Sequence, residues 1–256
     1  MILFSLLAIV IFGEYFKTDE SFGKRQLAVS LSLALVPYFL IGVPIAIYNY
    51  VRFGSFFEFG ARYNLTIFNM TVTEFSLAKL VQGLYENWFR LPTLHASFPF
   101  LELVKHDNTY WGRGFIFTED MYGGIVSCNV FLYSVFLLSF LKKEDSQKKN
   151  FYLSSLLLLI SFIILCVDVK MAGISYRYLG DYSFALFLAA FMVIAFFWKE
   201  LQGSKYEWQV KKGILILLGA SIFFNLMIFF ADSYKYPLVQ GNTVLYYEIM
   251  NMINVW

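Results

Sequence analysis

Residues 151–169, "FYLSSLLLLISFIILCVDV", establish the class of fold. This run of 19 residues contains one charged side chain, Asp168. About 20 consecutive apolar residues, wound as an α-helix, cross the hydrocarbon core of a bilayer. The run therefore predicts a membrane-spanning helix.

The rest of the chain has the same character. It is 59% hydrophobic and 15% charged, whereas soluble domains carry about 25% charged residues. Comparable apolar runs occupy 26–48, 122–141, 180–198 and 213–231, and a shorter one lies at 1–16. We predict an all-α, polytopic transmembrane helical bundle. It has five full spans, one partial N-terminal span and a single transmembrane domain over 1–256.

The remaining composition limits the kinds of site to expect. A net charge of +2 gives no reason to expect a nucleic-acid partner. Cys128 and Cys166 fall inside predicted spans, which argues against a disulfide framework. His95 and His106 stand apart from any cluster of ligand residues, so no metal site is predicted. No cofactor is predicted either.

Basic residues orient the predicted spans. Loops 13–25, 142–149 and 199–212 hold three, four and four lysines or arginines, 11 of the 20 in the chain. Cytoplasmic loops of membrane proteins carry an excess of Lys and Arg. These three loops alternate correctly with the spans, so we expect them in the cytoplasm. The expected location is a cell membrane, crossed several times, with loop 49–121 on the outer side.

Loop 49–121 contains an amphipathic pattern. In "EFSLAKLVQGLYENWF", Glu74–Phe89, the apolar residues recur at helical spacing, and Trp88 is one of them. One interpretation is a helix lying at the outer membrane face, with its aromatic rings at headgroup depth. The alternative is a helix packed on the other spans.

The segment that follows the 26–48 span, "YNYVRFGSFFEFGARYNLT" (Tyr48–Thr66), combines aromatic rings with charges. Arg52, Glu58 and Arg62 are its charged residues, and Tyr63 follows them directly. A guanidinium group suits bidentate capture of phosphate. Two interpretations stay open: specific binding of a phosphate-bearing ligand, or non-specific lipid contact combined with pairing to Glu58.

A second group of charges occurs in "GISYRYLGDYS", 173–183. If this segment is helical, Arg177 and Asp181 form an i,i+4 pair on one face. In one interpretation the segment is an interfacial anchor with an internal ion pair. In the functional interpretation, Arg177 faces the same outer cavity as the two earlier arginines.

The segment 48–66, followed in order by "FPFLE" (98–102), "MYGGI" (121–125) and "RYLGDYS" (177–183), resembles part of a known group of proteins. These are large bacterial multispan proteins related to the C-type, polyprenyl-phosphate-sugar-dependent glycosyltransferases. The resemblance covers about 27–191. Phe56 departs from it, because a proline is expected after the Gly-Ser pair.

The resemblance implies that the chain handles a polyprenyl-phosphate-linked sugar at the outer face of the membrane. Arg52, Arg62 and Arg177 would bind phosphate, and Tyr63 and Trp88 would support sugar or lipid. In this group a carboxylate in the first outer loop acts as general base. We find no such loop here, and Glu58 and Asp181 are candidates by position only.

The chain is therefore expected to be the C-terminal part of a larger protein, or to need an upstream module or a partner chain for catalysis. The alternatives are a non-enzymatic envelope component that binds a lipid-linked glycan, or a transporter.

Overall fold

A computed structural model describes residues 24–63, 76–96, 98–103, 118–140, 145–231 and 238–253. The predicted partial span 1–16 and the first part of the basic loop 13–25 lie outside the described residues. The chain divides into two compact units, Met1–Glu74 and Phe75–Trp256. Each unit is described by itself.

Unit 1 is built on one long helix, α2 (Lys24–Phe53), followed by a short 3₁₀ turn, η1 (Ala61–Tyr63). The helix continues for five residues beyond its predicted end at Tyr48, so the predicted loop 49–121 begins with a helical segment. Residues Leu35–Phe53 are long and apolar enough to cross a membrane.

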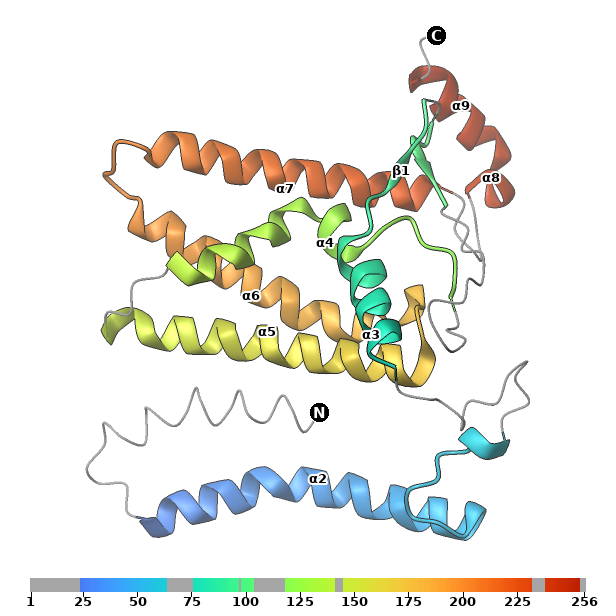
Figure 1. Cartoon of the computed structure of the whole chain (residues 1–256), viewed down its shortest axis with the longest axis vertical. Helices are drawn as coiled ribbons and strands as arrows, with labels where there is room; N and C mark the ends of the chain where they lie inside the picture. The colour runs from blue at the N-terminus through green and yellow to red at the C-terminus, as the bar shows by residue number, and fades with distance from the viewer. Residues whose placement is uncertain are drawn as a thin grey trace. The chain divides into compact units, whose positions relative to one another are not determined.

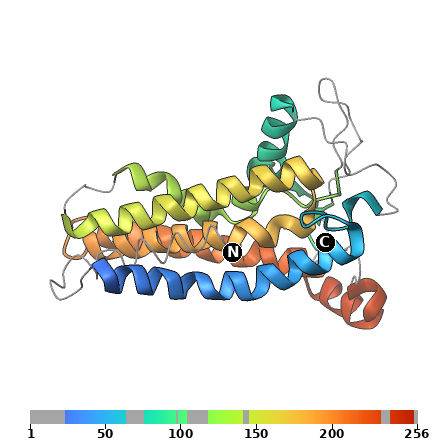
Figure 2. The ribbon, with the colours of Figure 1, turned by 90° about the horizontal axis from the view of Figure 1, so that it is seen from below.

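Unit 2 contains three long apolar helices, which run side by side (Figures 1 and 2). They are α5 (Asp145–Ala172), α6 (Leu179–Glu200) and α7 (Glu207–Phe230). Each covers one predicted span. Together with α2, the described part of the chain has four helices long and apolar enough to cross a membrane, in agreement with the predicted helical membrane fold.

The predicted span 122–141 is not one continuous α-helix. It consists of α4 (Ile125–Cys128) and a 3₁₀ helix, η3 (Val130–Phe140). The break is at Asn129, where φ is −122° and ψ is 72°. The Asn129 amide donates to the Ile125 carbonyl at 3.0 Å and accepts from Asn225 of α7 at 2.7 Å. A broken helix at membrane depth is tolerated where neighbouring helices satisfy the freed polar groups. The contact places Asn225 in an interhelical hydrogen bond.

The predicted amphipathic segment is helical from Leu77 onward. An α-helix, α3 (Leu77–Leu84), continues as a π-helix, η2 (Tyr85–Phe89). Glu74 and Phe75 lie outside the described residues. The helix packs on α5 and α4, so the alternative of a helix packed on the spans is confirmed. The smaller elements are β1 (Thr93–Leu94), β2 (Leu101–Glu102), η4 (Tyr176–Tyr178), α8 (Leu238–Gly241) and α9 (Thr243–Ile253).

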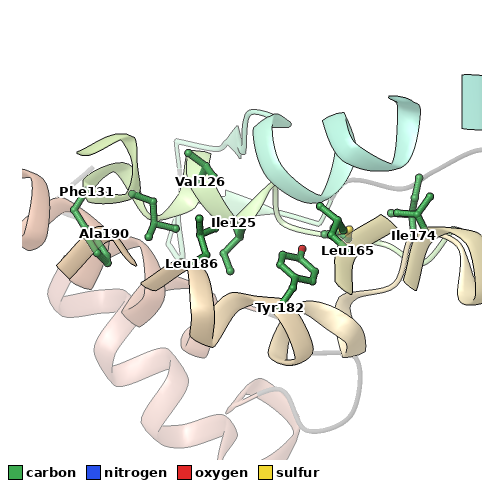
Figure 3. Close-up of a cluster of buried hydrophobic side chains, with 11 residues drawn as sticks. Ile125, Val126, Phe131, Leu165, Ile174, Tyr182, Leu186 and Ala190 are labelled. Carbon is green, nitrogen blue, oxygen red and sulfur yellow. The ribbon is translucent and has the colours of Figure 1, made fainter. Parts of the chain in front are cut away.

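The main core of unit 2 lies between α4, η3, α5 and α6 (Figure 3). Tyr182 and Leu186 of α6 meet Leu165 of α5 and Ile125 of α4 there. A second cluster joins the β1–β2 hairpin region to the end of α7 and to α9, through Phe98, Met227 and Tyr246. The α6–α7 connection lies at the opposite end of α7 from this cluster (Figure 1).

Candidate functional site

The end of α2 forms a compact structure that we call the aromatic turn, residues 48–63. Gly54 donates its N–H to the Tyr50 carbonyl at 2.8 Å and has a φ of +69°. Gly60 has a φ of +90°. Residues other than glycine rarely adopt this backbone region, so these two positions of the turn favour glycine.

Two ring pairs hold the aromatic turn against the helix. The Tyr50 and Phe56 rings stack with centroids 4.7 Å apart, and the Phe53 and Tyr63 rings stack at 5.2 Å. Such pairs contribute roughly 0.5–1.5 kcal/mol each beyond the area that they bury. Asn49 is buried beneath the turn, and its amide donates to the Phe56 carbonyl at 3.4 Å. Stacking therefore fixes the position of Tyr63, whose other side remains exposed.

Glu58 stabilises the turn from inside. Its Oε1 accepts the N–H of Gly60 at 2.9 Å and the N–H of Arg62 at 3.4 Å. Its Oε2 lies 3.5 Å from Arg62 Nε. The pairing of Arg62 with Glu58, which the sequence left open, is thus present. Because the Arg62 side chain is 77% exposed, water screens this pair and its contribution to stability is small.

Arg52 is held by aromatic groups. Its Nη1 donates to the Tyr48 hydroxyl at 2.9 Å, and its guanidinium carbon lies 5.0 Å from the Phe53 ring centroid. Within the described part of unit 1, no carboxylate pairs with Arg52. The contacts with Tyr48 and Phe53 fix the orientation of the guanidinium group, and Arg52 is exposed.

In unit 2, Arg177 has a partner that the sequence did not identify. Its Nη2 donates to Glu119 Oε1 at 2.5 Å, and the Ser175 hydroxyl donates to Glu119 Oε2. The Glu119 N–H donates to the Ile174 carbonyl at 2.8 Å. The segment before α4 and the segment before α6 are thus joined through one carboxylate.

The predicted Arg177–Asp181 pair is not formed, because residues 176–178 are a 3₁₀ turn and α6 begins only at Leu179. Asp181 is exposed in the first turn of α6. A carboxylate is stabilised there by the helix dipole.

Trp88 packs inside unit 2. Its ring contacts Phe89 and Phe162 edge-on, with centroids 5.8 and 6.0 Å away, and it lies against the main core. The indole N–H is buried and has no hydrogen-bond partner among the residues that the structure describes. This environment is that of a packing residue, and a role for Trp88 as a sugar or lipid platform stays a prediction.

The predicted site residues divide between the two units. Arg52, Glu58, Arg62 and Tyr63 come together in the aromatic turn, whereas Trp88, Arg177 and Asp181 belong to unit 2. The prediction that Arg177 meets Arg52 and Arg62 at one phosphate stays a prediction. Among the described residues, no group of three or more His, Cys, Asp or Glu side chains is placed to hold a metal ion.

Sequence reasoning missed Glu119, Ser175 and the role of Tyr48. Both partners of Glu119 are more than 50 residues away in the sequence, so no local pattern identifies it. The only signal was a carboxylate in a polar section of the chain. Tyr48 lies four residues before Arg52, at the spacing of helical neighbours.

The chain was compared with protein-family models, curated proteins and solved structures. No match was found in any of the three.

Proposed function

We propose that this chain is a multispan membrane protein that binds a polyprenyl-phosphate-linked sugar at the outer face of the membrane. The proposal rests on two exposed guanidinium groups, those of Arg52 and Arg62, which lie in the aromatic turn at the end of an apolar helix. Phosphate on a lipid carrier is held at that depth, where the hydrocarbon ends. A fixed guanidinium group offers it charge and paired N–H donors.

The orientation follows from the basic residues and the aromatic side chains beside them. Lys211 lies over the Trp198 ring at 4.9 Å, and Lys212 over the Trp208 ring at 4.8 Å. Trp and Lys together are typical of a membrane–water interface, and Lys-rich loops are typical of the cytoplasmic side. In the proposed topology the α6–α7 connection is cytoplasmic, five spans cross the membrane, and the aromatic turn faces outward.

Glycosyl transfer needs a general base within hydrogen-bond reach of the acceptor. Glu58 already accepts two backbone N–H groups and faces Arg62. These contacts direct the carboxylate into the turn. We therefore assign donor binding to this chain and the base to an upstream module or a partner chain.

Because Glu58 is already paired within the turn, a second candidate function is also favoured. In it, the chain is a non-enzymatic envelope component that binds a lipid-linked glycan. The two functions share the phosphate site and differ in whether sugar is transferred when a partner that carries a general base is supplied.

The test is the affinity of the purified protein, in detergent, for a polyprenyl monophosphate, measured by titration calorimetry. The variant with both Arg52→Gln and Arg62→Gln should bind at least about tenfold more weakly, since a hydrogen bond to a charged group contributes about 1.5–3 kcal/mol. Lys205→Gln in the α6–α7 connection removes one positive charge elsewhere and should bind as the wild type does. Unchanged affinity in the double variant would refute the proposal.

A further inference from the structure

The α3–η2 segment has its polar and apolar sides reversed relative to a helix in water. Between Leu77 and Asn87, all the exposed residues are apolar or aromatic, and all the polar side chains are buried or half-buried. The exposed residues are Leu77, Ala78, Val81 and Tyr85. The polar residues are Lys79, Gln82, Glu86 and Asn87.

Two of the inward polar residues, Glu86 and Asn87, find partners within the protein, whereas Gln82 Oε1 is buried without a hydrogen-bond partner among the described residues. Glu86 pairs with Arg90 at 2.5 Å, and the Asn87 amide donates to the Gly83 carbonyl at 2.8 Å. The Tyr182 hydroxyl of α6 lies 3.4 Å from Asn87 Oδ1. Burial of Glu86 and Asn87 is therefore compensated by charge pairing and hydrogen bonds, as polar groups inside a membrane protein require.

The segment lies beside the apolar part of α5. A Cβ atom at Gly83 would lie 2.3 Å from Val169 Cγ1, so the two backbones approach closely there. Trp88 contacts Phe162, near the middle of the apolar stretch Asn150–Ala172. Both views show α3 running across the axis of α5 (Figures 1 and 2). If α5 crosses the membrane, α3 lies roughly in the membrane plane and within the depth of α5.

The identity of the medium around α3 follows from the side chains that face it. In water, the exposed apolar surface of Leu77 and Val81 would be unfavourable, because burying apolar area stabilises a protein. In hydrocarbon, exposure of these apolar side chains is favourable. The polar side chains are the ones that must then be shielded from the surroundings, and they face the protein. The exposed side of α5 continues this apolar surface through the half-exposed Phe162, which touches Trp88.

We propose that the face formed by Leu77, Ala78, Val81 and Tyr85 contacts lipid acyl chains. The segment α3–η2 is then embedded in the bilayer beside α5, with the Glu86–Arg90 pair shielded from lipid. This inference concerns unit 2 alone and does not depend on which ligand the aromatic turn binds.

The test places single cysteines at Ala78 and Val81 in a chain with Cys128→Ala and Cys166→Ala. Each is spin-labelled in lipid nanodiscs, and its collision rates with oxygen, which concentrates in lipid, and with a water-soluble nickel chelate are measured. Leu159→Cys, on the exposed side of α5, is the lipid control, and Gln202→Cys, in the α6–α7 connection, is the water control.

Both α3 labels should match the Leu159 label, with frequent oxygen and rare nickel collisions. Nickel collisions as frequent as at Gln202 would place this face in water. Rare collisions with both reagents would show that protein covers it. Either result overturns the proposal. Ala78 keeps the test valid if Val81→Cys fails to fold, because it is exposed and small.

Discussion

Arg177 donates to Glu119, 58 residues before it in the chain, and not to Asp181, four residues after it. The same carboxylate accepts the Ser175 hydroxyl, so one acidic group joins the residues before α4 to those before α6. Glu119 lies next to Thr118, which forms a β-bridge with Ile174. The Glu119–Arg177 ion pair therefore lies beside this backbone bridge and links the same two segments.

This relationship predicts measurable coupling between the two residues. In a double-mutant cycle of Glu119→Gln and Arg177→Gln, followed by thermal unfolding in detergent, the two effects should be less than additive. Because the Arg177 side chain is 66% exposed, water screens the pair, and the coupling should be about 0.2–1 kcal/mol and fall with added salt. The cycle of Arg177→Gln with Asp181→Asn is the control and should be additive. Coupling in the control cycle alone would contradict the observed pairing.

A second prediction concerns the close contact between α3 and α5. Gly83→Ala places a Cβ atom against Val169, and overpacking of this kind costs about 1–3 kcal/mol. Gly219→Ala in α7 meets no atom within 4 Å, and it should leave stability unchanged or raise it slightly, because alanine favours a helix over glycine. The measurement is the midpoint of thermal unfolding in detergent. Val169→Ala, added to Gly83→Ala, should recover part of the loss. Equal midpoints for the two glycine variants would show that α3 and α5 are not in close contact.

A third prediction concerns topology. A cysteine at Gln202, in the α6–α7 connection, and one at Asn251, in α9, should lie on opposite sides of the membrane. α7 separates them and crosses once. In the background without Cys128 and Cys166, a membrane-impermeant maleimide added to intact cells should label Asn251→Cys only. Permeabilised cells, in which both should be labelled, are the control. Labelling of both positions in intact cells would contradict the orientation.

The long helices were predictable because the property that defines them is local. A continuous apolar run is enough to specify α5, α6 and α7, and the predicted bounds of 151–169 agree with the observed stretch Asn150–Ala172. The run 122–141 is equally apolar, yet it breaks at Asn129. At the break, Asn129 accepts a hydrogen bond from Asn225, 96 residues away, and no local pattern reveals this partner.

The candidate site divides in the same way. Gly54, Gly60 and the Glu58–Arg62 pair lie within a few residues of one another, so their roles could be predicted from spacing and residue type. The partner of Arg177 could not, because Glu119 reaches it only through the fold. The orientation of α3 was also beyond the sequence, since the helical pattern gives the two faces but not the medium that each face meets.

The final prediction concerns the chemistry of the aromatic turn. If Arg52 and Arg62 bind one phosphate as planar forks, Arg52→Lys and Arg62→Lys should each weaken binding of a polyprenyl phosphate, since an ammonium group keeps the charge but loses the paired donors. Arg52→Lys should have the larger effect, because Arg52 is fixed by the Tyr48 hydroxyl and the Phe53 ring, whereas Arg62 is shared with Glu58. Tyr48→Phe removes only the hydroxyl and should reproduce part of the Arg52→Lys loss without a change in charge. Titration in detergent measures all three variants. Wild-type affinity in all of them would mean that the arginines serve only as general positive charge at the membrane surface.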